Sequence, residues 1–173
     1  MHRRGFTLIE LLITVAIVAI LAYLVTVATY HLKEKSKLAR VTVELTDISK
    51  AVTEYAEDNN YQYPPDASRA VPPGLEKYLA GGVWPASVWP HGVFDWDNWS
   101  PADQGVPAQI YQINYRLCDL GDPASYCSDP DLFPTFNSHS GIFYCISGPC
   151  IPHPDEPTAP AYCVNCTPKK RNY

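Results

Sequence analysis

The feature that most constrains the fold is an apolar run of 25 residues, 6–30, in which Glu10 is the only charged side chain. As a helix with a rise of about 1.5 Å per residue, this run is roughly 37 Å long, which is enough to cross a bilayer. Arg3 and Arg4 stand close before it, and positive charge next to a membrane segment stays in the cytoplasm. We therefore expect a single-pass protein of the cytoplasmic (inner) membrane, with its N-terminus in the cytoplasm and its remaining residues outside.

Glu10 distinguishes this run from two simpler kinds of apolar segment. A cleaved secretory signal peptide has a shorter apolar core with a small-residue cleavage site after it, and no Ala-x-Ala sequence stands directly after residue 30. An uncleaved signal anchor fits the length and the charge. It does not explain a carboxylate, because a carboxylate costs roughly 3 kcal/mol to insert at the centre of a membrane helix. Glu10 therefore indicates that the segment does more than anchor the chain.

The segment RRGFTLIELLITVAIVAIL resembles the N-terminus of type IV pilins and of type II secretion pseudopilins. The shared elements are a short basic leader, Gly5, Phe6 and a glutamate at the fifth position after the glycine. This resemblance implies that a prepilin peptidase cleaves after Gly5 and methylates the new amine of Phe6. It covers only about the first 25 residues, and the family often carries Pro and Gly in its helix, whereas none occurs between Phe6 and Tyr63 here.

The resemblance also implies the function of the chain. It indicates a structural subunit, not an enzyme, of a type IV pilus (fimbrium) or a type II secretion pseudopilus. The implied partners are copies of the chain and other pilin-like subunits in a helical filament, the prepilin peptidase and an inner-membrane assembly platform.

In a filament, the Glu10 carboxylate would be buried without a partner unless the Phe6 amine of a neighbouring subunit neutralised its charge. We therefore expect Glu10 to set the register of assembly. A minor subunit that initiates or tips the fibre is the alternative within this class. Such subunits sometimes lack the glutamate, so Glu10 favours the body of the fibre.

The helical pattern continues beyond the membrane segment. Apolar residues recur at alternating spacings of three and four, on one face of a helix: Leu38, Val41, Leu45, Ile48, Val52 and Tyr55. Asp58-Asn59-Asn60 and the following Pro64-Pro65 end the pattern. We therefore expect a leader at 1–5, a transmembrane and assembly helix at 6–30, and an amphipathic continuation at 31–59. We favour packing of this stripe under the chain's own sheet over a coiled coil.

Residues 60–173 are expected to form an extracytoplasmic head. The stretch 109–117 alternates cleanly between apolar and polar side chains and is the clearest strand, with shorter candidates at 141–146 and 161–165. Residues 61–108 are expected to be a loop-rich connection with one short helix near 75–79. The predicted fold class is α+β: a long N-terminal helix packed on a small antiparallel sheet, followed by a disulfide-rich, loop-rich C-terminal region.

All four tryptophans fall in the loop-rich connection: Trp84, Trp89, Trp96 and Trp99. They would form an aromatic binding surface or close a core that has few aliphatic residues. We favour the core, because aromatic side chains bury a large area per residue.

All six cysteines lie in the last third of the chain: Cys118, Cys127, Cys145, Cys150, Cys163 and Cys166. An even number of cysteines beyond a membrane segment indicates disulfides formed in an oxidising compartment. Many pairings are open, and Cys118 with Cys127 is preferred because it would close a loop that leaves the strand. The alternative function is a membrane-anchored thiol-redox or zinc-binding protein. It would use Cys163-x-x-Cys166, with Cys145 and Cys150 as the further zinc ligands.

Other candidate chemistry is weaker. The cluster Asp95, Asp97, Asn98 and Asp103 suggests a calcium loop, as in family members that bind calcium, but its spacing does not fit an EF-hand. We interpret these carboxylates, and the pair Asp129 and Asp131, as solvated loop side chains, and we expect no metal and no other cofactor. His139, between Ser138 and Ser140, is not part of a recognisable triad. The net charge of −5 argues against nucleic acid as a partner.

Overall fold

The computed structural model describes residues 7–104, 106, 108–118, 140–151 and 161–166. The helices are α1 (Leu8–Asp58) and α2 (Pro101–Gln104), with 3-10 helices η1 (Leu75–Lys77) and η2 (Ala80–Gly82). The strands are β1 (Val93–Trp99), β2 (Ile110–Arg116), β3 (Gly141–Ser147) and β4 (Ala161–Cys163). The chain divides into two compact units, Met1–Ser36 and Lys37–Tyr173, which we describe separately. We refer to the second unit as the head.

The long helix predicted for 6–59 is α1, and its C-terminal end has a clear structural cause. Asn60 and Tyr61 adopt left-handed φ values of 55° and 60°, and asparagine tolerates this conformation better than most residues. The Tyr61 N–H donates to the carbonyl of Ala56 at 2.7 Å, and the Asn59 side chain donates to the carbonyl of Tyr55 at 2.8 Å. These bonds satisfy carbonyls at the end of the helix, as the stop signal in the sequence predicted.

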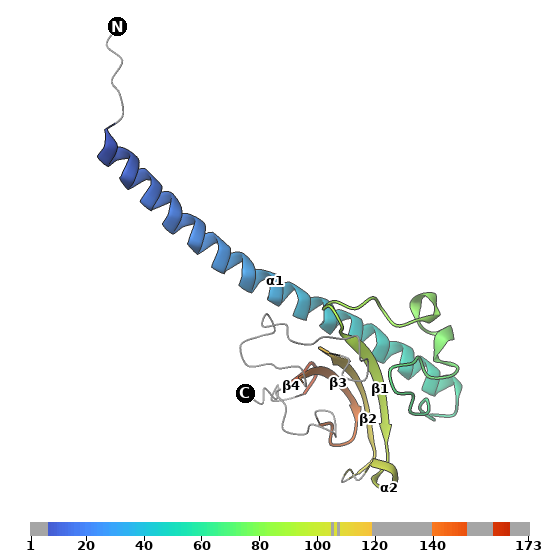
Figure 1. Cartoon of the computed structure of the whole chain (residues 1–173). Coiled ribbons are helices and arrows are strands. Elements are labelled where there is room, and N and C mark those ends of the chain that lie inside the picture. The colour runs from blue at the N-terminus through green and yellow to red at the C-terminus, as the bar shows by residue number, and fades with distance from the viewer. Residues whose placement is uncertain (1–6, 105, 107, 119–139, 152–160, 167–173) are drawn as a thin grey trace. The chain divides into compact units, whose positions relative to one another are not determined.

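The four strands form one sheet in the order β1-β2-β3-β4 (Figure 1). β1 pairs with β2 and β2 pairs with β3 in antiparallel fashion, whereas β3 and β4 are parallel. The α+β class is confirmed, but the sheet is mixed and not antiparallel. The 13 residues 148–160 separate β3 from β4, and a connection of about a dozen residues is long enough for a parallel crossover.

β1 lies in the stretch that the sequence predicted to be loop, so that prediction was wrong for residues 93–99. The strand alternates between two kinds of side chain: Phe94 and Trp96 pack in the main core, while Asp95 and Asp97 lie on the opposite face. Carboxylates are depleted in strands, which made this alternation easy to interpret as loop. The short helix expected near 75–79 is present as η1, and a second short helix, η2, follows it.

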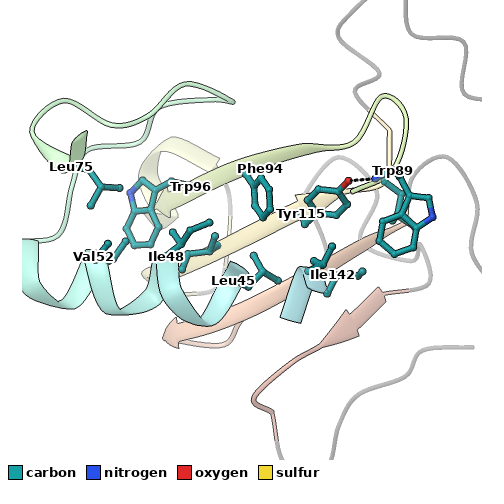
Figure 2. Close-up of a cluster of buried hydrophobic side chains, with 13 residues drawn as sticks. Leu45, Ile48, Val52, Leu75, Trp89, Phe94, Trp96, Tyr115 and Ile142 are labelled. Atoms are coloured by element: carbon teal, nitrogen blue, oxygen red, sulfur yellow. Dashed lines mark hydrogen bonds between the residues drawn. The ribbon is translucent and has the colours of Figure 1, made fainter. Parts of the chain in front are cut away.

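The main core lies between the head's part of α1 and one face of the sheet (Figure 2). The predicted stripe supplies it from the helix, since Val41, Leu45, Ile48 and Val52 are at most 1% exposed. The sheet contributes Phe94, Trp96, Ile113, Tyr115 and Ile142. The stripe thus packs under the chain's own sheet, as predicted.

The tryptophan residues belong mainly to the interior, as predicted. Trp89 and Trp96 are at most 2% exposed in the main core, and Trp84 is half-buried against it. Trp99, at 3% exposed, lies in a second buried cluster with Ile110 and Phe143. The Tyr115 hydroxyl accepts the N–H of Trp89 at 2.9 Å (Figure 2). This bond holds the loop before β1 against β2, and it places the Trp89 ring over one end of the core.

A pair of alanine substitutions on α1 tests the direction of its buried face. Leu45→Ala should lower the free energy of unfolding of the head by about 2–5 kcal/mol, because it leaves a cavity under the sheet. Val43→Ala, at a side chain that is 58% exposed, should change it by no more than about 0.5 kcal/mol. Denaturant titration of the detergent-solubilised chain, followed by tryptophan fluorescence, measures both. Equal losses for the two variants would contradict the assigned face.

Candidate functional site

The N-terminus of α1 places Glu10 in a capping box with Thr7. The backbone N–H of Thr7 donates to Glu10 Oε2 at 2.9 Å, and the Thr7 hydroxyl donates to the same oxygen at 2.7 Å. In return, the Glu10 N–H donates to Thr7 Oγ1 at 3.3 Å. This reciprocal arrangement satisfies two backbone N–H groups that would otherwise lack partners at a helix start. It also fixes the carboxylate beside the first turn, where the helix dipole favours negative charge.

Gly5 and Phe6, the predicted cleavage and methylation residues, lie outside the described residues. Thr7 is the first described residue, so the carboxylate is held by the residue directly after Phe6. The sequence analysis did not single out Thr7. Its signal was nevertheless present, because Thr7-x-x-Glu10 before an apolar run is the pattern of a capping box.

The helix that follows Glu10 is apolar over its whole surface. Among the described residues, Leu8–Thr26 is the one helical segment long and apolar enough to cross a membrane, with a mean hydropathy of 2.8 and no buried part. Its large apolar side chains are more than half exposed, from Ile17 at 52% to Leu8 at 77%. Such a surface requires lipid or other apolar helices around it.

The hydroxyls of Thr14 and Thr26 in this segment are hydrogen-bonded within the helix. Thr14 Oγ1 donates to the carbonyl of Leu11 at 2.9 Å, and Thr26 Oγ1 donates to the carbonyl of Tyr23 at 2.7 Å. A polar group without a partner is costly in hydrocarbon. Between Leu8 and Thr26, Glu10 is the only charged residue, and the hydrogen-bond donors to its carboxylate come from Thr7 of the same chain.

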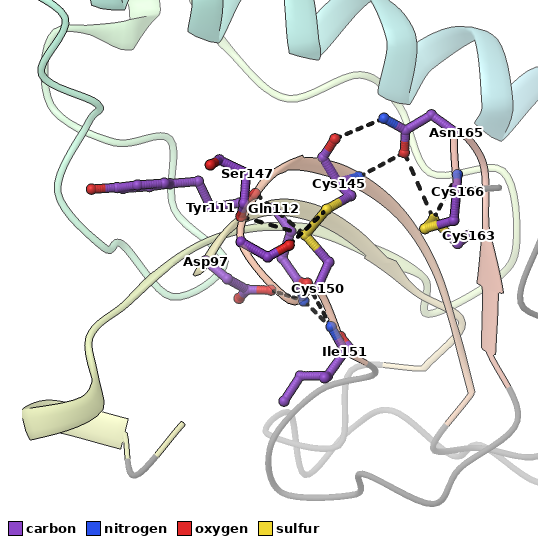
Figure 3. The surroundings of a disulfide bond; sticks show 11 residues. Asp97, Tyr111, Gln112, Cys145, Ser147, Cys150, Ile151, Cys163, Asn165 and Cys166 are labelled. Atoms are coloured by element: carbon purple, nitrogen blue, oxygen red, sulfur yellow. Dashed lines mark hydrogen bonds between the residues drawn. A yellow bond between two sulfur atoms is a disulfide. The ribbon is translucent and has the colours of Figure 1, made fainter. Parts of the chain in front are cut away.

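In the head, the cysteines are paired, as predicted. Cys145 is bonded to Cys150 and Cys163 to Cys166, with Cα atoms 5.7 and 5.5 Å apart (Figure 3). These four sulfur atoms are therefore used in two disulfides and are not available together as zinc thiolates. Cys118 is also disulfide-bonded, and its preferred partner, Cys127, lies outside the described residues.

Asn165, which the sequence analysis did not identify, links the two disulfides. Its Nδ2 donates to the carbonyl of Cys145 at 2.7 Å, and its Oδ1 accepts the N–H of Cys145 at 2.9 Å (Figure 3). The side chain thereby imitates a strand backbone beyond the end of β4. No local sequence signal marks this role, because it depends on the parallel pairing of β3 and β4.

A buried polar row crosses β1 and β2 on the sheet face opposite the main core. Asp95 and Asp97 are only 1% and 2% exposed, so their interpretation as solvated loop carboxylates was wrong. Asp95 forms an ion pair with Arg116 and accepts the N–H of Arg69 at 2.8 Å. These partners compensate for the burial of the Asp95 carboxylate.

Asp97 has amide partners in place of a cation. Its Oδ2 accepts from Gln112 Nε2 at 3.1 Å and also from the side-chain amide of Asn114. Burial, together with the neighbouring Asp95 charge, raises the pKa of Asp97 well above its ordinary value, although Gln112 and Arg116 oppose the shift. The folded head therefore favours the neutral form of Asp97 more strongly than water does.

The predicted calcium cluster does not come together as a site. Asn98 is used within the protein, since its Nδ2 donates to the carbonyl of Pro64 at 2.7 Å and its Oδ1 accepts from Gln109 at 2.7 Å. In the part of the chain that the structure describes, no group of three or more His, Cys, Asp or Glu residues is arranged to hold a metal. The Asp103 side chain is not described, and the candidates Asp129, Asp131, Ser138 and His139 lie outside the described residues.

The comparisons with known proteins agree with the N-terminal segment and are silent on the head. Residues 1–23 match the family model described as the prokaryotic N-terminal methylation motif, which is the signal of type IV pilins and pseudopilins. Neither the curated proteins nor the solved structures contain a match to the chain.

Asp97→Asn tests the buried carboxyl. Because the folded state raises the pKa of Asp97, its protonated form stabilises the wild-type head fully below the ordinary value of about 4, and this stability is lost as the pH rises through the raised value. Asparagine imitates the neutral acid at every pH. The variant should therefore become more stable relative to wild type as the pH rises from about 4 to 8.

The measurement is the free energy of unfolding at several pH values, with Glu54→Gln as a control for the loss of one exposed carboxylate. Parallel curves for wild type and Asp97→Asn across this range would show that Asp97 does not titrate differently in the folded head.

Proposed function

From the N-terminal methylation motif at residues 1–23, we propose that this chain is a structural subunit of a type IV pilus or a type II secretion pseudopilus. A prepilin peptidase cleaves it after Gly5 and methylates the amine of Phe6. The mature chain then assembles through its N-terminal helix into a filament with copies of itself and other pilin-like subunits. The match to this motif is the single observation that carries the proposal.

The capping box gives Glu10 a defined state before assembly. In the membrane, its carboxylate has the Thr7 N–H and hydroxyl as partners within its own chain. Cleavage adds a positive amine on Phe6, one residue before Thr7. The carboxylate then lies beside a charged N-terminus and is not stranded alone in the bilayer.

Assembly changes the partner of this charge. In a packed bundle of apolar helices, a neighbour's Phe6 amine can approach Glu10, and the attraction between opposite charges is strong where water is excluded. A subunit in the wrong register leaves one of these charges buried without its partner, which costs about 3–5 kcal/mol. Glu10 thus selects the register in which each new helix packs.

The apolar surface of Leu8–Thr26 supports the same proposal. It is exposed along its length, and a surface of this kind is stable in lipid or against similar helices. The same face can therefore serve as a membrane anchor before assembly and as the contact between subunits afterwards. The chain is a single-pass inner-membrane protein in the first state and a filament component in the second.

The head supplies the outer part of the subunit. Its core and its disulfides lie within Lys37–Tyr173, and disulfides persist in an oxidising, extracytoplasmic compartment. The zinc form of the alternative function requires free thiolates, whereas Cys145, Cys150, Cys163 and Cys166 are paired in disulfides.

The mature chain should begin at Phe6 and carry one methyl group on its amine. Mass spectrometry of the chain recovered from sheared surface filaments measures the cleavage, the methyl group and the disulfides together. A residue 1–5 leader still present on filament-associated protein would overturn the proposal.

Glu10→Gln and Glu10→Ala should lower the amount of the chain in sheared filaments by more than about tenfold, because the neighbour's amine loses its buried partner. Thr14→Val, which removes a hydroxyl that is bonded only within its own helix, should assemble normally. Immunoblots of the sheared and membrane fractions measure both, and membrane levels should stay equal to those of wild type. Normal filament levels for both Glu10 variants would contradict the pairing.

A further inference from the structure

Two described disulfides of the head, Cys145–Cys150 and Cys163–Cys166, share one pattern of exposure. In each, one cysteine is buried and the other is partly exposed: Cys150 and Cys163 are buried, whereas Cys145 and Cys166 are partly exposed. An external thiolate can reach only the exposed sulfur directly, so it expels the buried sulfur as the leaving group. The rate at which each bond opens therefore depends on how well the surroundings of Cys150 or Cys163 stabilise the departing thiolate.

The buried sulfur of Cys163 faces a hydrogen-bond donor. The backbone N–H of Cys166 donates to Cys163 Sγ at 3.2 Å (Figure 3). The side-chain oxygen of Asn165 lies farther away, at 3.7 Å, and is already bonded to the N–H of Cys145. An N–H aimed at sulfur stabilises a thiolate as it forms, which favours departure of Cys163.

The buried sulfur of Cys150 differs in having two carbonyl oxygens beside it and no N–H donor among its described contacts. It lies 3.6 Å from the carbonyl oxygen of Ser147 and 3.8 Å from that of Tyr111. The N–H of Cys150 donates to the carbonyl of Gly148 at 2.9 Å and so does not serve the sulfur. Carbonyl oxygens repel a developing thiolate, so departure of Cys150 is disfavoured.

From this contrast, we propose that Cys163–Cys166 is a thiol–disulfide exchange site of the head, entered at Cys166 by a dithiol protein of the extracytoplasmic space. The partner's thiolate attacks Cys166 Sγ and forms a mixed disulfide, while the Cys163–Cys166 bond breaks and its electron pair leaves on Cys163 Sγ. The partner's second thiolate then attacks the partner's first sulfur, which is bonded to Cys166 in the mixed disulfide. The bond to Cys166 breaks, and Cys166 leaves as a thiolate. The partner is oxidised to a disulfide, and Cys163 and Cys166 take up two electrons and two protons. The reverse sequence inserts the bond during folding.

Exchange at this site changes the contact between β3 and the end of β4. The closed Cys163–Cys166 loop contains Val164, whose N–H donates to the carbonyl of Phe143 at 2.9 Å, and Asn165, whose side chain binds the backbone of Cys145. The disulfide holds both residues in one turn beside β3. Opening it releases this turn, whereas Cys145–Cys150 stays closed. The inference goes beyond the proposed function, because it concerns the head of a single chain.

The test uses the full-length chain in detergent micelles and dithiothreitol as the probe dithiol. Short exposures are followed by acid quenching, alkylation and peptide mass spectrometry, which report the opening of each disulfide with time. Cys163–Cys166 should open at least about tenfold faster than Cys145–Cys150. The amide of Cys145 should then exchange its hydrogen faster, because it loses the Asn165 acceptor. An equal or faster opening of Cys145–Cys150 would overturn the proposal, and no variant needs to fold for this measurement.

A matched pair of variants tests the point of entry. Cys163→Ser leaves the Cys166 thiol free, and Cys166→Ser leaves the Cys163 thiol free. The first thiol should react with a small aromatic disulfide reagent at least about tenfold faster than the second, because Cys163 is fully buried. Faster reaction of Cys163 would show that the site is entered from the other side. Filaments are not involved in either experiment, so these results are independent of whether the chain assembles.

Discussion

The contact between the second half of α1 and the sheet organises the head. Four side chains of the helix are almost completely buried: Val41, Leu45, Ile48 and Val52. The aromatic and branched side chains of one face of the sheet pack against them. Removing this much apolar surface from water is the main favourable term in folding a domain of this size. Tyr115 extends this core by accepting a hydrogen bond from the backbone N–H of Trp89, in the loop before β1.

The opposite face of the sheet has different chemistry, and it shows why charge patterns are hard to interpret from sequence. Asp95 and Asp97 are buried there with partners from β2: a cation for the first and amides for the second. The partners come from residues 15 to 21 positions away, so a local pattern carries no trace of them. Without these partners, a strand with two carboxylates would be a poor candidate for burial, which is why Asp95 and Asp97 were expected to be solvated.

In the first unit, by contrast with the sheet, the polar contacts are made between residues close in the sequence. Its apolar helix has no partner within the described chain, and its one carboxylate is satisfied by the residue three positions before it. Interactions of this kind are local and periodic, so they can be predicted from the sequence: the helix, its stop, the buried stripe and the position of Glu10 all followed from spacing. The disulfides followed only in part, because composition indicates that cysteines pair but not how they react.

The sequence by itself determined the N-terminal motif, the length and faces of α1 and the strand at 110–116, because each depends on neighbours one helical turn or two strand positions away. It also indicated the presence of disulfides, through the number of cysteines and their place beyond the membrane segment. The tertiary structure decided the rest. It placed β4 parallel to β3, it buried the carboxylates of Asp95 and Asp97 in strand β1, and it brought the side chain of Asn165 against the backbone of Cys145. It also brought the carbonyl oxygen of Tyr111 to the buried sulfur of Cys150. These differences arise from contacts between segments distant in the chain, and only folding brings such segments together.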